Sequence, residues 1–115
     1  MKRRTILASI GAVVASILVK GSANPARADG PIHHRVMITD FEFVPSVLTV
    51  RSGDLVTWVN LDIAPHTATA REKAWDTKRL NAKQEETIEV KAGMETDYFC
   101  RFHPMMKAKL RIFEG

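Results

Sequence analysis

The sequence has a single cysteine, Cys100, among its 115 residues. One cysteine cannot form an internal disulfide, so the chain is not a small domain held together by disulfide bonds. Glycine and proline are also scarce, at six and five residues, which excludes collagen-like and low-complexity chains. The length and the hydrophobic content of 45% fit one globular domain.

Acidic residues are absent from the first 28 positions. All thirteen acidic residues follow Ala28, whereas five of the seventeen basic residues precede it. The formal net charge of +4 therefore belongs to the start of the chain, and the remainder is close to neutral. This balance gives no reason to expect a nucleic-acid partner.

An apolar run long enough to cross a membrane is also lacking. The run from Ile6 to Val19 has fourteen residues, whereas a spanning helix needs ~20. It follows the basic residues 2–4 and precedes the small-residue pattern Ala26-Arg27-Ala28, and these are the three parts of an export signal. We expect cleavage after Ala28, which leaves residues 29–115 as one mature domain.

The segment Arg3-Arg4-Thr5-Ile6-Leu7 resembles a bacterial twin-arginine signal, although Lys2 and Ala8 depart from the fuller pattern. An ordinary secretory signal whose basic start contains two arginines is the alternative. Both routes lead out of the cytoplasm, so we expect a periplasmic protein without stable membrane insertion. In that oxidising compartment Cys100 must be buried, paired between chains or bound to a ligand.

Helical periodicity is missing after residue 28, and short alternating segments take its place. These segments are residues 36–38, 47–50, 55–59, 87–90, 96–100 and 107–112. The turn at 51–54 predicts that segments 47–50 and 55–59 form a hairpin. About six to eight short strands in a domain of this size predict an all-β fold, a Greek-key β-sandwich.

Several possible metal ligands lie close together near the end of the chain. Cys100, His103 and Met106 follow a Cys-x2-His-x2-Met pattern, and Met105 offers a second thioether. A second imidazole is available from His66, in a loop further upstream. Blue-copper sites use two histidines, one cysteine and a weak axial methionine, so this donor set suits copper. Zinc also accepts cysteine and histidine but gains little from a thioether.

This ligand pattern resembles that of the cupredoxins, the type 1 blue copper family. Pro104 directly after the second histidine and Pro65 directly before the first are similar to the amicyanin group of that family. Further features occur in the same order, namely Phe41-Glu42-Phe43, Gly53-Asp54, Trp58 and Asp97-Tyr98-Phe99-Cys100. The resemblance covers nearly all of residues 29–115 and implies a cupredoxin-like sandwich.

The resemblance also implies one type 1 copper ion held by His66, Cys100, His103 and Met106. Met105 is the alternative axial ligand, although the spacing favours Met106. Thr67 occupies the position at which many cupredoxins have an asparagine that tethers the ligand loops. Its hydroxyl group either makes an equivalent bond or leaves the loops without that tether.

Four protein ligands around one ion leave no position for a substrate, so we expect an electron carrier and not an enzyme. The resemblance implies that the exposed edge of His103 is the electron port, with transient docking around His103, Pro104 and Met105. It implies redox proteins as partners, for example an amine dehydrogenase as donor and a c-type cytochrome as acceptor. We expect the chain to be a monomer.

Other interpretations stay open at this point. A copper-delivery protein would hold Cu(I) with the same ligands without cycling between oxidation states. A structural sandwich without metal would require the ligand pattern to be a coincidence. His33 and His34 are either a second metal site or a solvated pair that opens the first strand. Positive charges near the port either steer an acidic partner or are solvated strand residues, and they are Arg101, Lys107 and Lys109.

Overall fold

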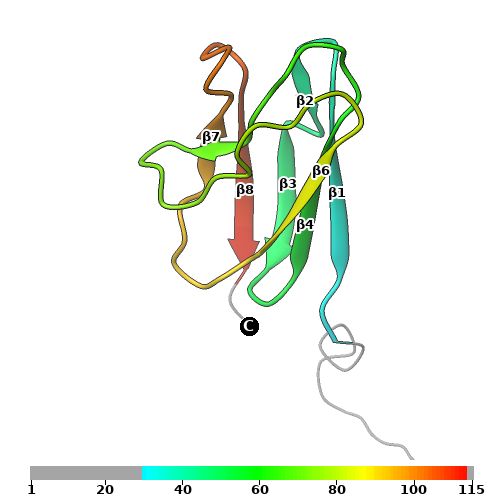
Figure 1. Ribbon diagram of the computed structural model, residues 1–115. Helices are drawn as coiled ribbons and strands as arrows, with labels where there is room; N and C mark the ends of the chain where they lie inside the picture. Colours follow the sequence, from blue (N-terminus) through cyan, green and yellow to red (C-terminus); the bar gives the residue numbers. More distant parts are fainter. Residues whose placement is uncertain (1–29, 114–115) are drawn as a thin grey trace, which may run out of the picture. The chain divides into compact units, whose positions relative to one another are not determined.

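The structure of the protein is a computed structural model that describes residues 30–113 (Figure 1). The predicted export signal, residues 1–28, and the expected cleavage after Ala28 lie outside the described residues. Among residues 30–113, no helix is long and apolar enough to span a membrane. The regular structure in this range consists of β-strands.

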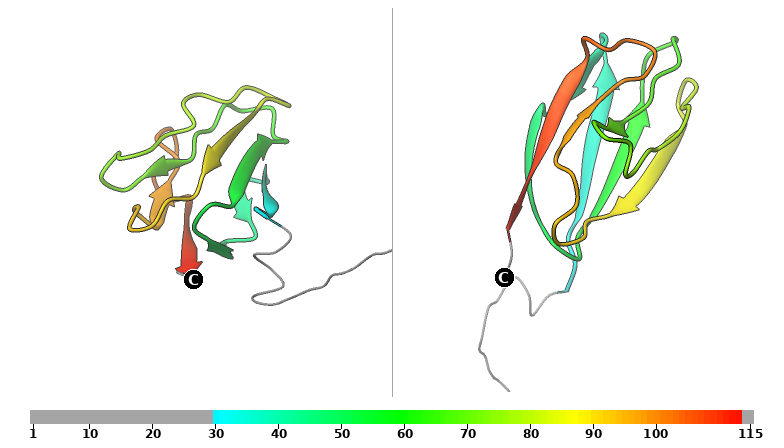
Figure 2. Two further views of the ribbon diagram at one scale, coloured as in Figure 1. Left: turned by 90° about the horizontal axis from the view of Figure 1, so that it is seen from below. Right: turned by 90° about the vertical axis from the view of Figure 1, so that its left-hand side faces the viewer.

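Eight strands form two four-stranded sheets. They are β1 (His33–Thr39), β2 (Glu42–Val44), β3 (Val47–Arg51), β4 (Leu55–Asn60), β5 (Thr69–Ala70), β6 (Glu85–Glu89), β7 (Asp97–Phe99) and β8 (Lys107–Phe113). One sheet has the order β2-β1-β4-β6 and the other the order β3-β8-β7-β5. The two sheets face each other (Figure 2), which confirms the predicted β-sandwich.

The predicted hairpin between residues 47–50 and 55–59 is wrong. β3 lies beside β8, with Val50 opposite Ile112, whereas β4 lies in the other sheet between β1 and β6. The turn between them crosses the sandwich, because Val50 and Val56 face the core from different sheets and are both buried. Alternation identifies a strand and its buried face, but it does not show which strand becomes the neighbour.

The core lies between the sheets and is built from alternate residues of the strands. In β8, Leu110 is buried while Lys109 and Arg111 face solvent, as the alternation predicted. Trp58 of β4 is fully buried and stacks on Trp75, with the ring centroids 5.2 Å apart. Burial of each large apolar side chain contributes about 1.5–3 kcal/mol, so these layers hold the loops on a stable frame.

One end of the sandwich gathers three connections that lie far apart in the sequence (Figure 1). They are the β1–β2 turn, the β4–β5 loop and the β7–β8 loop. The β3–β4 turn and the start of β1 lie at the opposite end. The topology therefore brings the loop of His66 and the loop of Cys100 and His103 to the same end.

At the opposite end, the buried carboxylate of Asp54 ties the β3–β4 turn to β1. Its oxygens accept hydrogen bonds from the N–H groups of Ile32 and Arg51, each at 3.0 Å, and one lies 2.9 Å from Nε2 of His34. Burial acts to raise the pKa of Asp54, but the hydrogen bonds from Ile32, His34 and Arg51 outweigh it and lower the pKa below its ordinary value. The ionised form is therefore the one that stabilises the fold.

We expect Asp54→Asn to lower the free energy of unfolding by about 1–3 kcal/mol at neutral pH, because a buried N–H group loses its acceptor. Since the folded-state pKa is depressed, the carboxylate stabilises the fold above the ordinary pKa of about 4 and loses this effect as the pH falls through the folded-state pKa. The difference in the free energy of unfolding between wild type and variant should therefore become smaller in acid. Urea unfolding at a series of pH values measures it.

The matched control is Asp97→Asn, which removes a carboxylate that is 49% exposed and pairs with Arg71 at 3.6 Å. Exposed pairs contribute little, so this variant should unfold at nearly the wild-type urea concentration. A destabilisation by Asp54→Asn that persists unchanged in acid would show that the charge of the carboxylate has no role.

Candidate metal centre

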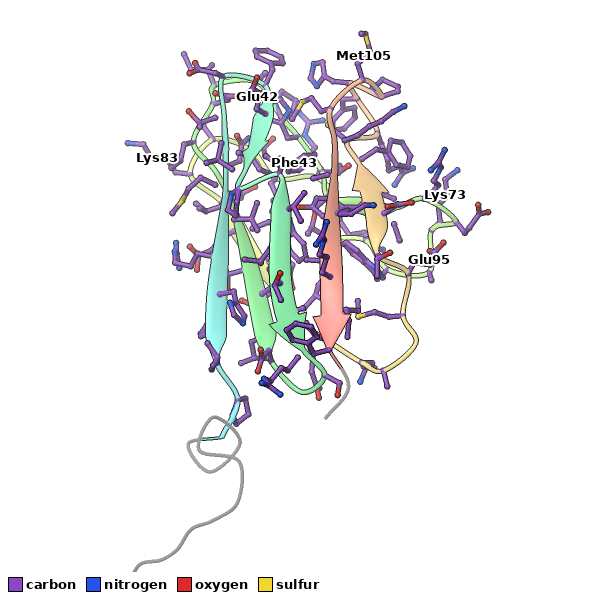
Figure 3. All side chains as sticks on the ribbon, turned by 180° about the vertical axis from the view of Figure 1, so that it is seen from behind. Glu42, Phe43, Lys73, Lys83, Glu95 and Met105 are labelled. Atoms are coloured by element: carbon purple, nitrogen blue, oxygen red, sulfur yellow. The ribbon has the colours of Figure 1, made fainter. Side chains whose placement is uncertain are left out.

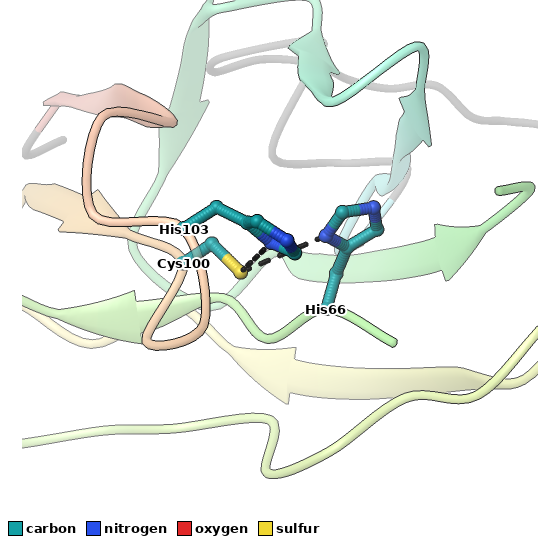
Figure 4. A group of neighbouring side chains, drawn as sticks. All are labelled: His66, Cys100 and His103. Atoms are coloured by element: carbon teal, nitrogen blue, oxygen red, sulfur yellow. Dashed lines mark hydrogen bonds between the residues drawn. The ribbon is translucent and has the colours of Figure 1, made fainter. Parts of the chain in front are cut away.

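Two loops bring three of the predicted ligands together (Figure 4). His66 lies in the β4–β5 loop, and Cys100 and His103 lie in the β7–β8 loop. One donor atom from each of the three lies within 4.8 Å of the others. Sγ of Cys100 is 3.7 Å from Nδ1 of His66 and 3.6 Å from Nδ1 of His103.

These separations match donor atoms arranged around one metal ion. Bonds of about 2.0 Å to nitrogen and about 2.3 Å to sulfur, at trigonal angles, place the sulfur and each nitrogen about 3.7 Å apart. Cys100 and His66 are fully buried, whereas His103 is partly exposed. One thiolate and two imidazoles in this arrangement fit copper, which forms trigonal sites with that donor set.

Backbone hydrogen bonds explain the three-residue spacing in the β7–β8 loop. The N–H of His103 donates to the carbonyl of Cys100 at 3.2 Å, and the N–H of Met106 donates to the carbonyl of His103 at 2.8 Å. The N–H of Cys100 donates in turn to the carbonyl of Met106 at 3.0 Å. These three bonds form a closed backbone ring, which fixes the backbone from which all three side chains project.

The two methionines of this loop differ sharply in burial. Met106 is 7% exposed and packs in the hydrophobic core, whereas Met105 is 93% exposed. Figure 3 shows Met105 at the tip of the loop, pointing away from the sandwich. Met106 shares the burial of Cys100 and His66 and is therefore the axial candidate of the two.

A carboxylate that the sequence analysis did not connect with the site orients His66. Oδ2 of Asp62 lies 2.8 Å from Nε2 of His66. Burial acts to raise the pKa of Asp62, but the hydrogen bonds from Phe41, His66 and Asp40 outweigh it and lower the pKa. An ionised carboxylate only accepts, so Nε2 carries the proton and Nδ1 turns its lone pair toward Cys100. The four-residue spacing of Asp62 and His66 was the only signal of this pair in the sequence.

The β1–β2 turn also reaches the site. Asp40 and Phe41 have positive φ angles of 53° and 60°, a conformation that is uncommon for residues other than glycine. The carboxylate of Asp62 holds this turn by accepting both backbone N–H groups, at 2.7 and 2.9 Å. The ring of Phe41 then meets both imidazoles edge-on, with its centroid 5.1 Å from that of His66 and 4.9 Å from that of His103. These contacts restrict rotation of both imidazole rings.

Thr67 connects the two ligand loops by hydrogen bonds. Its hydroxyl group therefore does make a bond between the loops, which the sequence alone left open. Its N–H donates to Sγ of Cys100 at 3.4 Å. Its Oγ1 accepts a hydrogen bond from the N–H of Arg101 at 2.9 Å. A threonine can therefore join these loops where many cupredoxins use an asparagine.

His33 and His34 lie apart from this cluster, near the start of β1. Nε2 of His33 is 2.7 Å from Oγ1 of Thr57, and Nε2 of His34 is 2.9 Å from the carboxylate of Asp54. Within residues 30–113, one group of three or more His, Cys, Asp or Glu side chains is arranged to hold a metal ion, and it contains neither of them. They act as hydrogen-bonding residues of the first strand.

Comparisons with known proteins agree with the fold and the donor set. The sequence profile of the cupredoxin-like domain family matches residues 9–112. Amicyanin-alpha from Methylorubrum extorquens is 26% identical over 97% of this chain and 99% of its own length. The crystal structure of amicyanin from Paracoccus versutus aligns with a TM-score of 0.63 and 28% identity, over 75% of this chain and 87% of that one.

A larger protein shares the fold as well. A copper-containing nitrite reductase from Thermus scotoductus SA-01 aligns with a TM-score of 0.70 and 24% identity, over 84% of this chain but only 28% of the reductase. Sequence identity at this level shows a common fold and no more. The reaction of that enzyme therefore does not carry over to this chain.

The match to the family profile includes both loops that carry the cluster. The buried cysteine sulfur beside two imidazole nitrogens is also the donor set of trigonal copper sites. Sequence, topology and site chemistry lead independently to the same assignment. The chain belongs to the cupredoxin family, and its cofactor is copper.

Proposed function

We propose that this protein is a type 1 copper electron carrier whose ligands are His66, Cys100, His103 and Met106. Bound copper would supply a one-electron couple between Cu(II) and Cu(I). The observation that carries the proposal is the buried sulfur of Cys100, which lies 3.6 and 3.7 Å from the Nδ1 atoms of His103 and His66.

The residues around the cluster contribute rigidity. The closed backbone ring fixes the three loop ligands, and the hydrogen bond from His66 to Asp62 fixes the ring of the fourth. Phe41 packs against both imidazoles. A site that keeps one geometry in both oxidation states loses little energy to rearrangement during each transfer, which favours fast electron exchange.

Burial of the ligands supports electron transfer over catalysis and over copper delivery. Cys100 and His66 are fully buried and Met106 nearly so, which leaves a substrate no open ligand position. A delivery protein must let the ligands of an incoming protein reach the ion, whereas here only His103 is partly exposed. Electrons need no such access, because they can pass through the imidazole of His103.

The surface around His103 suits a transient partner. The two ligand loops expose the apolar side chains of Ile63, Phe102 and Met105. Weak redox encounters bury less than about 1,200 Å² in total, which a patch of this kind can provide. The donor and acceptor we propose are redox proteins, for example an amine dehydrogenase and a c-type cytochrome.

A groove of about 620 Å³ lies beside the β7–β8 loop, and Pro104, Lys107 and Lys109 are among the residues that line it. The two lysines place positive charge in this region. Arg101 pairs with Asp76 at 3.0 Å, so its charge is partly compensated. Lys107 and Lys109 have no ion-pair partner among residues 30–113 and are the better candidates for steering an acidic partner. Association should then slow as salt screens the charges.

The proposed location is the bacterial periplasm. It rests on the export-signal pattern of residues 1–28, with its basic start, apolar run and small-residue cleavage pattern. An electron carrier with a buried thiolate ligand is compatible with that oxidising compartment, because a metal-bound thiolate is not free to form disulfides.

We expect Cys100→Ser to abolish the intense visible absorption of the Cu(II)-loaded protein, because that band requires a copper–thiolate bond. The wild type should show a blue band that a mild reductant bleaches and an oxidant restores, measured by absorption spectroscopy. An unchanged band in the variant would exclude Cys100 as a ligand. A colourless wild type that retains Cu(I) would indicate delivery, and a wild type that binds no copper would refute the proposal.

We expect Met106→Leu to leave copper bound but to shift the reduction potential, because the axial thioether is a weak ligand that tunes the couple. The matched control is Met105→Leu, which changes an exposed side chain of the same type one residue away and should leave the potential unchanged. Cyclic voltammetry of both variants measures the shift. The opposite outcome, a shift in Met105→Leu alone, would assign the axial position to Met105.

We expect the double variant Lys107→Glu, Lys109→Glu to slow oxidation of the reduced protein by hexacyanoferrate(III) several-fold at low salt, because the anionic oxidant is no longer attracted. Stopped-flow absorption at increasing salt measures the rate. Lys91→Glu is the control, since it reverses an exposed charge in the β6–β7 connection at the other end. Equal slowing in the control would mean that net charge, and not this surface, sets the rate.

A further inference from the structure

A closed circuit of hydrogen bonds links the two ligand loops through a third segment of the chain. Arg101 donates its backbone N–H to Oγ1 of Thr67 at 2.9 Å. Oγ1 of Thr67 lies 2.9 Å from Oγ1 of Thr69, which donates to Oδ1 of Asp76 at 2.9 Å. The other carboxylate oxygen of Asp76 accepts from Nη1 of Arg101 at 3.0 Å, so the circuit returns to the residue where it began.

The protons of this circuit can adopt only one arrangement. An ionised carboxylate accepts and does not donate, so the hydroxyl of Thr69 donates to Asp76. The oxygen of Thr69 is then the acceptor for the hydroxyl of Thr67, which in turn accepts from Arg101. All the bonds point toward the carboxylate, and hydrogen bonds arranged in this way polarise and strengthen one another in a buried environment.

The circuit adjoins the copper ligands along the chain. Thr67 directly follows His66, and Arg101 directly follows Cys100. Thr67 also donates its own N–H to Sγ of Cys100 at 3.4 Å. Thr67 and Thr69 are both buried, so water cannot easily replace a partner that is lost. The position of Thr67 between the loops therefore determines the distance from its N–H group to the sulfur of Cys100.

Asp76 lies in neither ligand loop. It belongs to the irregular segment 72–83, where a backbone bridge pairs it with Thr69. Its Oδ1 also accepts the N–H of Lys78 at 2.8 Å, which limits rotation of the carboxylate. A segment without any metal ligand therefore supplies the charged end of the circuit.

We infer that Asp76 is a positioning residue for the copper site: through Thr69 and Thr67, its carboxylate sets how closely the Thr67 N–H approaches the Cys100 sulfur. The electrochemical consequence of this inference rests on the proposed copper function. The mechanical consequence, that Asp76 holds the two ligand loops against each other, does not.

The electrochemical consequence has a definite sign. An N–H directed at the sulfur stabilises negative charge on it, and the copper–sulfur unit is more negative by one charge after reduction. The hydrogen bond therefore favours the reduced form, in keeping with the tuning of such potentials by hydrogen bonds around the cysteine sulfur. A weakened circuit should lower the reduction potential and move the visible band.

Two variants interrupt the circuit at different points with little change of shape. Asp76→Asn has one acceptor oxygen and one donor nitrogen at its end, so it must lose the bond to either Thr69 or Arg101. Thr69→Val removes the hydroxyl but leaves the ion pair of Asp76 and Arg101 in place. If one variant fails to fold, the other carries the test.

Each variant has a matched control outside the circuit. Asp97→Asn removes the same charge from β7, three residues before Cys100, where, among residues 30–113, the carboxylate forms an ion pair with exposed Arg71 alone, at 3.6 Å. Thr49→Val makes the same replacement at an exposed position of β3. Voltammetry, visible absorption and hydrogen–deuterium exchange followed by NMR on the Cu(I) protein are applied to these four variants, to the double variant Asp76→Asn, Thr69→Val and to the wild type.

We expect Asp76→Asn and Thr69→Val to lower the potential, to move the visible band and to speed amide exchange at Thr67 and Arg101 several-fold. The double variant should change these quantities no more than the larger single variant, because both act on one circuit. Both controls should match the wild type.

The inference is overturned if Asp76→Asn changes the potential no more than Asp97→Asn does, because the effect is then one of charge alone. Unchanged exchange at Thr67 and Arg101 overturns it too, because Asp76 then does not hold the loops. A wild-type protein without a blue band would refute the proposed function instead, and the exchange measurement on that protein would still decide the role of Asp76.

Discussion

The central constraint on this structure is that three electron-rich donor atoms must point at one place. One donor atom each of Cys100, His66 and His103 lies within 4.8 Å of the others, and the sulfur is within hydrogen-bonding distance of both Nδ1 atoms. A thiol has one proton and can donate to only one imidazole at a time, so surrounding bonds are needed to keep both rings directed at the sulfur. The strands of the sandwich provide a rigid support, and the hydrogen bonds and ring contacts around the site add to that rigidity.

The candidate ligands are held both by bonds within their own loops and by bonds to other parts of the chain. Asp62 fixes the ring of His66 and also supports the β1–β2 turn that places Phe41 against both imidazoles. The backbone ring fixes the β7–β8 loop, and Thr67 joins that loop to the loop of His66. Cys100 and His66 are fully buried, whereas His103 is partly exposed. This division suits a centre that must exchange electrons but not ligands.

The strands and the donor residues could be predicted from the sequence because their signals are local. Alternation identified β8 by Leu110 and its basic neighbours, and the Cys-x2-His-x2-Met pattern lies within seven consecutive positions. The hairpin prediction failed because sheet membership depends on which strand lies alongside, and no local pattern specifies that. Asp76 was missed for a similar reason: its partner Arg101 lies 25 positions away, and only the folded chain brings the two together.

The backbone ring has a consequence for how such a site can vary. Its three bonds join Cys100, His103 and Met106. The length of the loop and the spacing of the candidate ligands therefore cannot change independently. A single inserted residue would break the closure and move at least one ligand, whereas a whole loop that closes by its own bonds could replace this one. Variation at this end of the sandwich should therefore replace the complete segment between β7 and β8. The two sheets can stay the same while the new loop alters the redox properties of the metal.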